Sequence, residues 1–151
     1  MKIIIDDLSG GDVIQLLEEH LADMYAVSPP ESVHALDIVS LKAPEITFFS
    51  GWENEQLQGC VALKTLTSDH VELKSMRTTR AARGKGVAKQ LLTHALNAAQ
   101  ANGFTTVSLE TGAEDYFIPA RKLYEKFGFS YCAPFAQYID DPNSRFMTKC
   151  L

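Results

Sequence analysis

The stretch MRTTRAARGKGVAKQLL, from Met76 to Leu92, leads from a strand-like pattern directly into a helical one. Basic side chains gather here although the whole chain has a formal net charge of −5. Glycines such as Gly84 and Gly86 let the backbone approach a ligand closely, and a helix N-terminus favours negative charge. The stretch therefore predicts a site at which backbone N–H groups hold an anion.

Two well-known phosphate-binding motifs do not account for this stretch. A Walker A loop requires G-x-x-x-x-G-K-[ST], a spacing that the chain does not contain. A dinucleotide fingerprint requires a third glycine where Lys89 stands, and it belongs on the first strand–helix turn of a parallel sheet. A dinucleotide-binding oxidoreductase is therefore disfavoured.

Length and composition indicate one globular domain over residues 1–151. The acidic balance argues against binding to nucleic acid or to an anionic membrane surface, and no apolar run approaches the about 18 residues of a membrane span. The stretch MKIIIDDLSG has an apolar run of only three residues before two aspartates, so its pattern does not predict a signal peptide. Three widely spaced cysteines indicate reduced thiols in a cytoplasmic protein, and the scattered histidines predict no metal site.

Strand-like and helical patterns alternate along the chain and predict a mixed α/β (α+β) domain. Helices are expected over residues 11–27, 32–41, 87–101 and 118–128, and strands over 2–6, 45–52, 57–66, 70–78, 104–111, 129–135 and 144–151. The short polar connections between the strands over 45–78 predict an antiparallel meander.

The hexapeptide Arg83–Ala88, RGKGVA, is similar to the R/Q-x-x-G-x-G/A loop of the GNAT superfamily of acyl-CoA-dependent N-acetyltransferases. The resemblance continues in VELKSMRT before the loop, and in VSLETG and PARKLYEKFGF after the following helix. The order of LETG, PARKLYEKFGF and DPNSRFM further resembles a small bacterial branch, the YsnE-like proteins. The resemblance implies the GNAT fold: a mostly antiparallel twisted sheet, splayed between its fourth and fifth strands and flanked by about four helices.

The resemblance also implies acetyl-CoA as co-substrate and predicts the residues that bind it. Main-chain groups of Met76 and Thr78 would pair with the pantetheine arm, and Arg77 belongs to a basic patch that suits a polyanionic cofactor. The pyrophosphate would lie on the amides of Arg83, Gly84, Lys85, Gly86, Val87 and Ala88. Phe117 stands where many relatives have asparagine, so one cofactor contact is missing or replaced there.

The resemblance implies catalysis by direct attack of an amine on the thioester, without a covalent enzyme intermediate. Tyr124 matches the tyrosine that donates a proton to the departing sulfur in many relatives, although it also lies on a predicted buried helix stripe. The general base is left open between Glu72, Glu110 and solvent, and Glu110 and His34 are the predicted substrate contacts.

The sequence therefore predicts an N-acetyltransferase that acts on a primary amine, with a small molecule favoured over a protein. The alternative is a non-catalytic acyl-CoA-binding module that regulates a partner. The identity of the acceptor and the presence of a homodimer are left open. No nucleic acid, membrane or metal is expected to take part.

Overall fold

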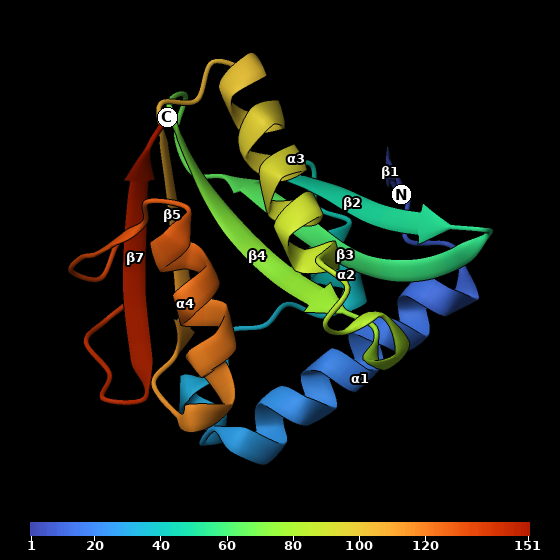
Figure 1. Cartoon of the computed structure of the whole chain (residues 1–151). Coiled ribbons are helices and arrows are strands. Elements are labelled where there is room, and N and C mark those ends of the chain that lie inside the picture. The colour runs from blue at the N-terminus through green and yellow to red at the C-terminus, as the bar shows by residue number, and fades with distance from the viewer.

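Seven strands form a single sheet in the order β1-β2-β3-β4-β5-β7-β6 in the computed structural model, which describes residues 1–151 (Figure 1). The strands are β1 (Lys2–Ile5), β2 (Ile46–Glu53), β3 (Gln56–Thr65), β4 (His70–Thr78), β5 (Thr106–Gly112), β6 (Ser130–Tyr131) and β7 (Ser144–Cys150). Every neighbouring pair is antiparallel except β4 and β5. This topology confirms the predicted mostly antiparallel sheet and its β2-β3-β4 meander.

Four helices flank the sheet, as predicted. They are α1 (Gly11–Val27), α2 (Ile38–Leu41), α3 (Val87–Ala101) and α4 (Ile118–Lys126), and single 3₁₀ turns cover η1 (Pro30–Ser32), η2 (Arg80–Ala82) and η3 (Asp115–Phe117). None of these helices combines the length and the apolar composition that crossing a bilayer requires.

The two faces of the sheet are packed by different helices because successive strand residues point to opposite sides. Phe49 and Val61 belong to the core that includes α3 and Tyr124 of α4. Their chain neighbours Phe48 and Cys60 belong to the second core, which includes α1 and α2. The sheet is therefore buried on both faces, and the strand alternation decides which helices each side chain meets.

The only parallel pair of strands separates soon after it forms. β4 and β5 pair through His70↔Thr106, Val71↔Val107 and Glu72↔Ser108, and no register continues beyond these three pairs. In Figure 1 the two strands diverge from their common end, and β5 then runs beside β7. The predicted splay between the fourth and fifth strands is therefore confirmed.

Two predicted elements differ from the structure. The helix expected over residues 32–41 exists only as Ile38–Leu41, because the Asp37 carboxylate caps a new helix start by accepting from Ser40 N at 2.8 Å, while residues 33–37 are irregular. The strand expected over 129–135 is limited to Ser130–Tyr131, and the chain then runs as a long irregular connection, the β6–β7 segment (residues 132–143).

Candidate active site

The glycine loop before α3 presents free backbone donors. Gly84 and Gly86 have φ angles of +77° and +78°, a region that favours glycine, and no atom lies within 4 Å of where a Cβ would stand. The amides of residues 84–86 have no hydrogen-bond partner in the chain, and the first helical bond runs from Gln90 N to Gly86 O. Together with the unpaired amides of the first helical turn, they form the kind of backbone cradle that suits a pyrophosphate.

A β-bulge in β4 changes the direction of the side chains just before this loop. The register with β3 shifts between Cys60 and Ala62, and Ser75 adopts a φ of 53°. The Cys60 thiol donates to the Ser75 carbonyl at 3.3 Å. Bulges re-aim side chains and are frequent beside active sites. Here Met76 packs against the α3 core, whereas Arg77 contacts α1.

A cavity of about 620 Å³ occupies the space between the parted strands. It is lined by nearly every residue that the sequence predicts to bind or react. The predicted residues that line it are His34, Glu72, Met76, Arg77, Thr78, Arg83, Gly84, Gly86, Val87, Ala88, Glu110, Phe117 and Tyr124, and Lys85 alone is outside. The structure therefore brings the predicted cofactor, acceptor and catalytic residues to one continuous cavity.

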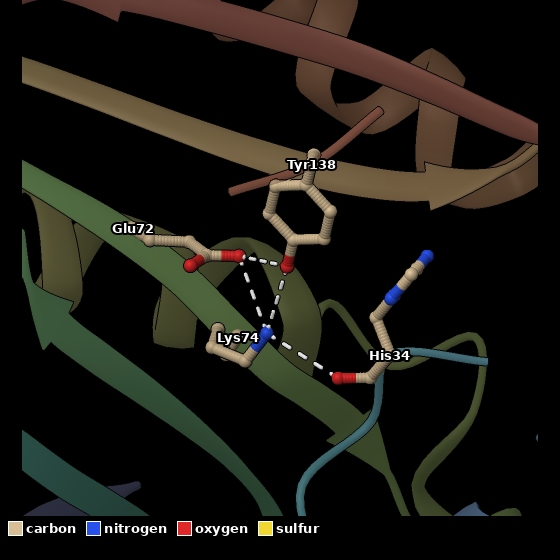
Figure 2. Close-up of polar contacts among 4 residues, drawn as sticks. All are labelled: His34, Glu72, Lys74 and Tyr138. Atoms are coloured by element: carbon tan, nitrogen blue, oxygen red, sulfur yellow. Dashed lines mark hydrogen bonds and ion pairs between the residues drawn. The ribbon is translucent and has the colours of Figure 1, made fainter. Parts of the chain in front are cut away.

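Glu72 is buried at the floor of this cavity in an ion-pair network (Figure 2). Its Oε2 lies 3.2 Å from Lys74 Nζ and also accepts from the Tyr138 hydroxyl. Lys74 Nζ further donates to Tyr138 Oη at 3.0 Å and to the His34 carbonyl at 3.4 Å, so its three N–H groups each have an acceptor. The charge of Glu72 is therefore balanced within the protein.

Glu110 faces the same cavity with a different environment. Burial raises the pKa of its carboxyl to about 7; the Glu72 and Asp141 carboxylates add to this rise, whereas the Lys74 ammonium opposes it. A carboxyl group that titrates near neutral pH can take a proton from a bound ammonium and release it again. Glu110 thus has the proton affinity that a general base requires.

Tyr124 is placed by α4 at the wall of the cavity. Only 6% of the residue is exposed, and its ring packs edge-on against Phe129 with the centroids 5.7 Å apart. Burial and the nearby Glu110 carboxylate raise the pKa of its hydroxyl. Tyr124 therefore keeps its proton at neutral pH, so a proton is available there for a departing thiolate.

His34 and Phe117 form parts of the cavity wall. The His34 ring lies edge-on to Tyr138 with the centroids 5.0 Å apart, and burial lowers its pKa, which favours the neutral form. Phe117 packs so closely on Gly112 that a Cβ there would lie 2.1 Å from its ring. Gly112 is therefore required for this ring position.

Arg77 has a more specific environment than the predicted basic patch. Arg83 and Lys85 are exposed, whereas Arg77 is buried and its Nη2 lies 2.6 Å from Asp23 Oδ2 of α1. Its Nη1 donates to the Tyr116 hydroxyl at 3.3 Å. A cofactor contact of Arg77 stays a prediction.

Sequence reasoning missed Tyr138, Lys74 and the bulge at Ser75. Tyr138 comes from the irregular β6–β7 segment, where no periodicity indicates which side chain turns inward. Lys74 follows Glu72 at the alternate position of β4, which is a same-face spacing that could have suggested their ion pair. The bulge had no signal, since neither Ser75 nor its neighbours are glycine.

A sheet that parts over a cavity, with a phosphate-type loop at its mouth and a titrating carboxyl inside, defines an acyltransferase of the acyl-CoA-dependent class. Residues 13–129 match the model of the acetyltransferase (GNAT) family. The chain belongs to this family, and it is an acetyl-CoA-dependent acyltransferase.

Comparison with individual proteins also supports membership of this family. The chain is 56% identical to a protein of Bacillus subtilis (strain 168) named uncharacterized N-acetyltransferase YsnE, over 151 residues that cover all of both chains. It is 47% identical to the uncharacterized N-acetyltransferase YedL of Escherichia coli (strain K12), over 97% of this chain and 92% of that one. The predicted resemblance to the YsnE-like branch is therefore confirmed.

The fold is also found in a solved structure. A Bacillus subtilis acetyltransferase in complex with CoA superimposes with a TM-score of 0.70 at 21% identity, covering 99% of this chain and 98% of that one. At this identity the likeness supports the fold alone.

Proposed function

We propose that this chain transfers the acetyl group of acetyl-CoA to the primary amine of a small molecule, by direct attack of the amine on the thioester. One observation carries the proposal: the cavity between β4 and β5 joins the open amides at Gly84 and Gly86 to Glu110 and Tyr124. The loop would hold the pyrophosphate, and the unpaired edge of β4 would receive the pantetheine arm. The thioester would then lie between the two titratable side chains.

The chemistry requires a base that takes a proton from the ammonium and an acid that protonates the thiolate, and each side chain suits one of these roles. Glu110 accepts the proton of the bound ammonium, which frees the amine lone pair for attack on the carbonyl carbon. The new C–N bond forms, the C–S bond breaks, and the Tyr124 hydroxyl gives its proton to the thiolate that leaves. The nitrogen carries one surplus proton after the attack and returns it to the Tyr124 oxygen, so the products are the amide, the CoA thiol and the one proton that Glu110 releases. Acid and base catalysis of this kind each contribute about 10²- to 10⁴-fold in rate.

Two segments limit the size of the acceptor. The Ser32 hydroxyl donates to Asp141 Oδ2 at 2.6 Å, and the Asn143 amide donates to Ser32 Oγ at 3.4 Å. These contacts tie the α1–α2 connection to the β6–β7 segment beside His34, and they leave one cavity of about 620 Å³ for the pantetheine arm and acceptor together. A small molecule fits this space better than a protein tail.

The first experiment measures acetyl-CoA binding by calorimetry in wild type and in Gly86→Glu. The substitution places bulk and negative charge where the pyrophosphate is expected. We therefore expect Gly86→Glu to bind acetyl-CoA at least about a hundredfold more weakly than the wild type, a loss of roughly 3 kcal/mol in binding free energy. Gly103→Glu is the matched control, because Gly103 also has a positive φ, +87°, with open space around it, but lies outside the cavity. Equal binding in wild type and Gly86→Glu would remove the cradle assignment.

The second experiment separates an enzyme from a binding module. We expect acceptor-dependent release of CoA from the wild type over a panel of small amines, and a fall in kcat of about a hundredfold in Tyr124→Phe. Tyr131→Phe, which removes an exposed hydroxyl bonded to Glu125, should leave kcat unchanged. Tight acetyl-CoA binding with no release of CoA over the whole panel would instead establish the non-catalytic module.

A further inference from the structure

A second polar group lines the cavity where α1 crosses the C-terminal end of β4 (Figure 1). It consists of His20 of α1, Arg77 of β4 and Tyr116 of η3, all of which contribute to the cavity wall. Neither the loop nor the proton transfers proposed above use these three side chains.

Two atoms of this group are covered and have no partner. Arg77 is 5% exposed, and its Nε makes no hydrogen bond. The Nδ1 of His20 is likewise buried and unpaired. Leaving a buried donor unsatisfied is destabilising, and more so for a charged group, so such atoms at a cavity wall indicate a partner that the free protein does not supply.

The unpaired groups of these three side chains can all act as hydrogen-bond donors. The Tyr116 hydroxyl accepts from Arg77 Nη1 at 3.3 Å and donates to no group in the chain, so its proton is free. Burial and the Arg77 charge lower the pKa of His20 to about 4, so its ring is neutral and can carry a proton on Nδ1. Together with the Arg77 guanidinium, these groups complement an anion with several acceptor oxygens.

The local charge also favours an anion. Asp23 is the carboxylate that contacts Arg77, but it is shared with Arg80, whose Nη2 lies 3.8 Å from Asp23 Oδ1. Two guanidinium groups therefore face one carboxylate. Glu114, whose Oε1 accepts from Ser28, is outside the cavity lining.

We propose that Arg77, His20 and Tyr116 form a carboxylate subsite, so that the acceptor is a primary amine that also carries a carboxylate, as an amino acid does. The proposal rests on the proposed acetyl transfer, because it names the class of acceptor for the same cavity. Tyr116 is 43% exposed, so its ring can move to admit the incoming carboxylate between its hydroxyl and the Arg77 guanidinium. The acceptor then lies with its carboxylate toward α1 and its amine toward Glu110 and Glu72.

The test compares acids with their amides, because the two differ in charge at one end only. Glycine, β-alanine and γ-aminobutyrate, each beside its primary amide, are titrated by NMR into the wild-type protein saturated with CoA. We expect at least one acid to bind about tenfold more tightly than its amide, as a charge-assisted contact would give. The best chain length reports how far the subsite lies from the amine position.

A variant tests whether Arg77 is responsible. Arg77→Lys keeps a cation beside Asp23 but loses the planar guanidinium with its unpaired Nε–H, so we expect it to remove the preference for the acid. Arg145→Lys, on β7 outside the cavity lining, should keep the preference. If Arg77→Lys does not fold, the double variant Arg77→Gln/Asp23→Asn removes both charges together.

The outcomes are distinct. Equal binding of acids and amides, tighter binding of the amides, or a preference unchanged in Arg77→Lys would each overturn the subsite. Because the titration measures binding without turnover, a protein that releases no CoA with any amine would contradict the acetyl transfer and leave the subsite result standing.

Discussion

Glu72 and Glu110 are carboxyl residues of adjacent strands that meet the same cavity with opposite surroundings. Glu72 lies 3.2 Å from Lys74 Nζ and accepts from Tyr138, so its carboxyl group has partners within the protein. Burial of the Glu110 carboxyl group raises its pKa to about 7. Neighbouring carboxyl groups whose environments differ in this way can take different roles, and we propose Glu110 as the base and Glu72 as a structural ion pair.

The first residue-scale prediction concerns pH. With Glu110 as base, kcat/KM rises as pH increases through about 7, since the deprotonated carboxylate is the active form. Glu110→Gln should lower the rate and lose this rise. All proteins are compared on the same acceptor, so that the titration of the amine itself cancels.

Glu72→Gln is the matched control for that measurement. It leaves the buried Lys74 ammonium without its carboxylate, so we expect a loss of about 3 kcal/mol in unfolding free energy. Because Glu72 contributes to the raised pKa of Glu110, the rise in rate should persist and move to lower pH. A rise lost in Glu72→Gln and kept in Glu110→Gln would reverse the two roles, and a rise kept in both would leave solvent as the base.

Among the elements, those with a regular period were predictable and the irregular connections were not. The apolar spacing of Val13, Leu16 and Leu17 predicts α1 with the bounds that it has, and the glycines before α3 predict its start. The β6–β7 segment has no period, so the inward direction of Tyr138 depends on tertiary contacts with Phe135, Phe146 and β4. The acceptor end of the site was for this reason less predictable than the cofactor end.

The element-scale prediction concerns this segment. Tyr138→Phe keeps the ring contacts but removes the hydroxyl that bridges Glu72 and Lys74, so we expect it to lower the unfolding free energy by about 1–3 kcal/mol in urea. Acetyl-CoA affinity should not change, because the loop at Gly84 and Gly86 is built from other elements. Loss of acetyl-CoA binding in a folded Tyr138→Phe protein would contradict this separation of the two ends.

At the scale of the whole molecule, one part of the sheet packs the core and another part forms the candidate site. Where β3 and β4 pair in regular register, apolar residues such as Leu63 and Leu73 are buried opposite one another. Where β4 and β5 part, the chain instead exposes unpaired backbone and places polar groups around a cavity. The sequence motif indicated this division because it marks the end of β4, but the motif holds no information on which carboxyl group the fold would bury.

Burial of Glu110 should therefore appear as a measurable cost to the stability of the protein. Its pKa rises from an ordinary 4.5 to about 7 on folding, so the folded protein holds this proton more tightly than the unfolded chain does. That stabilisation is complete below pH 4.5 and is lost as pH rises through about 7.

Because Glu110→Gln has no such titration, it should gain stability over the wild type as pH increases. From about 1.4 kcal/mol per pKa unit, we expect urea unfolding to show a gain that grows by about 2 kcal/mol between mildly acidic and mildly alkaline pH. A difference that stays constant with pH would mean that Glu110 titrates alike in both states, and it would remove the physical basis for choosing it as the base.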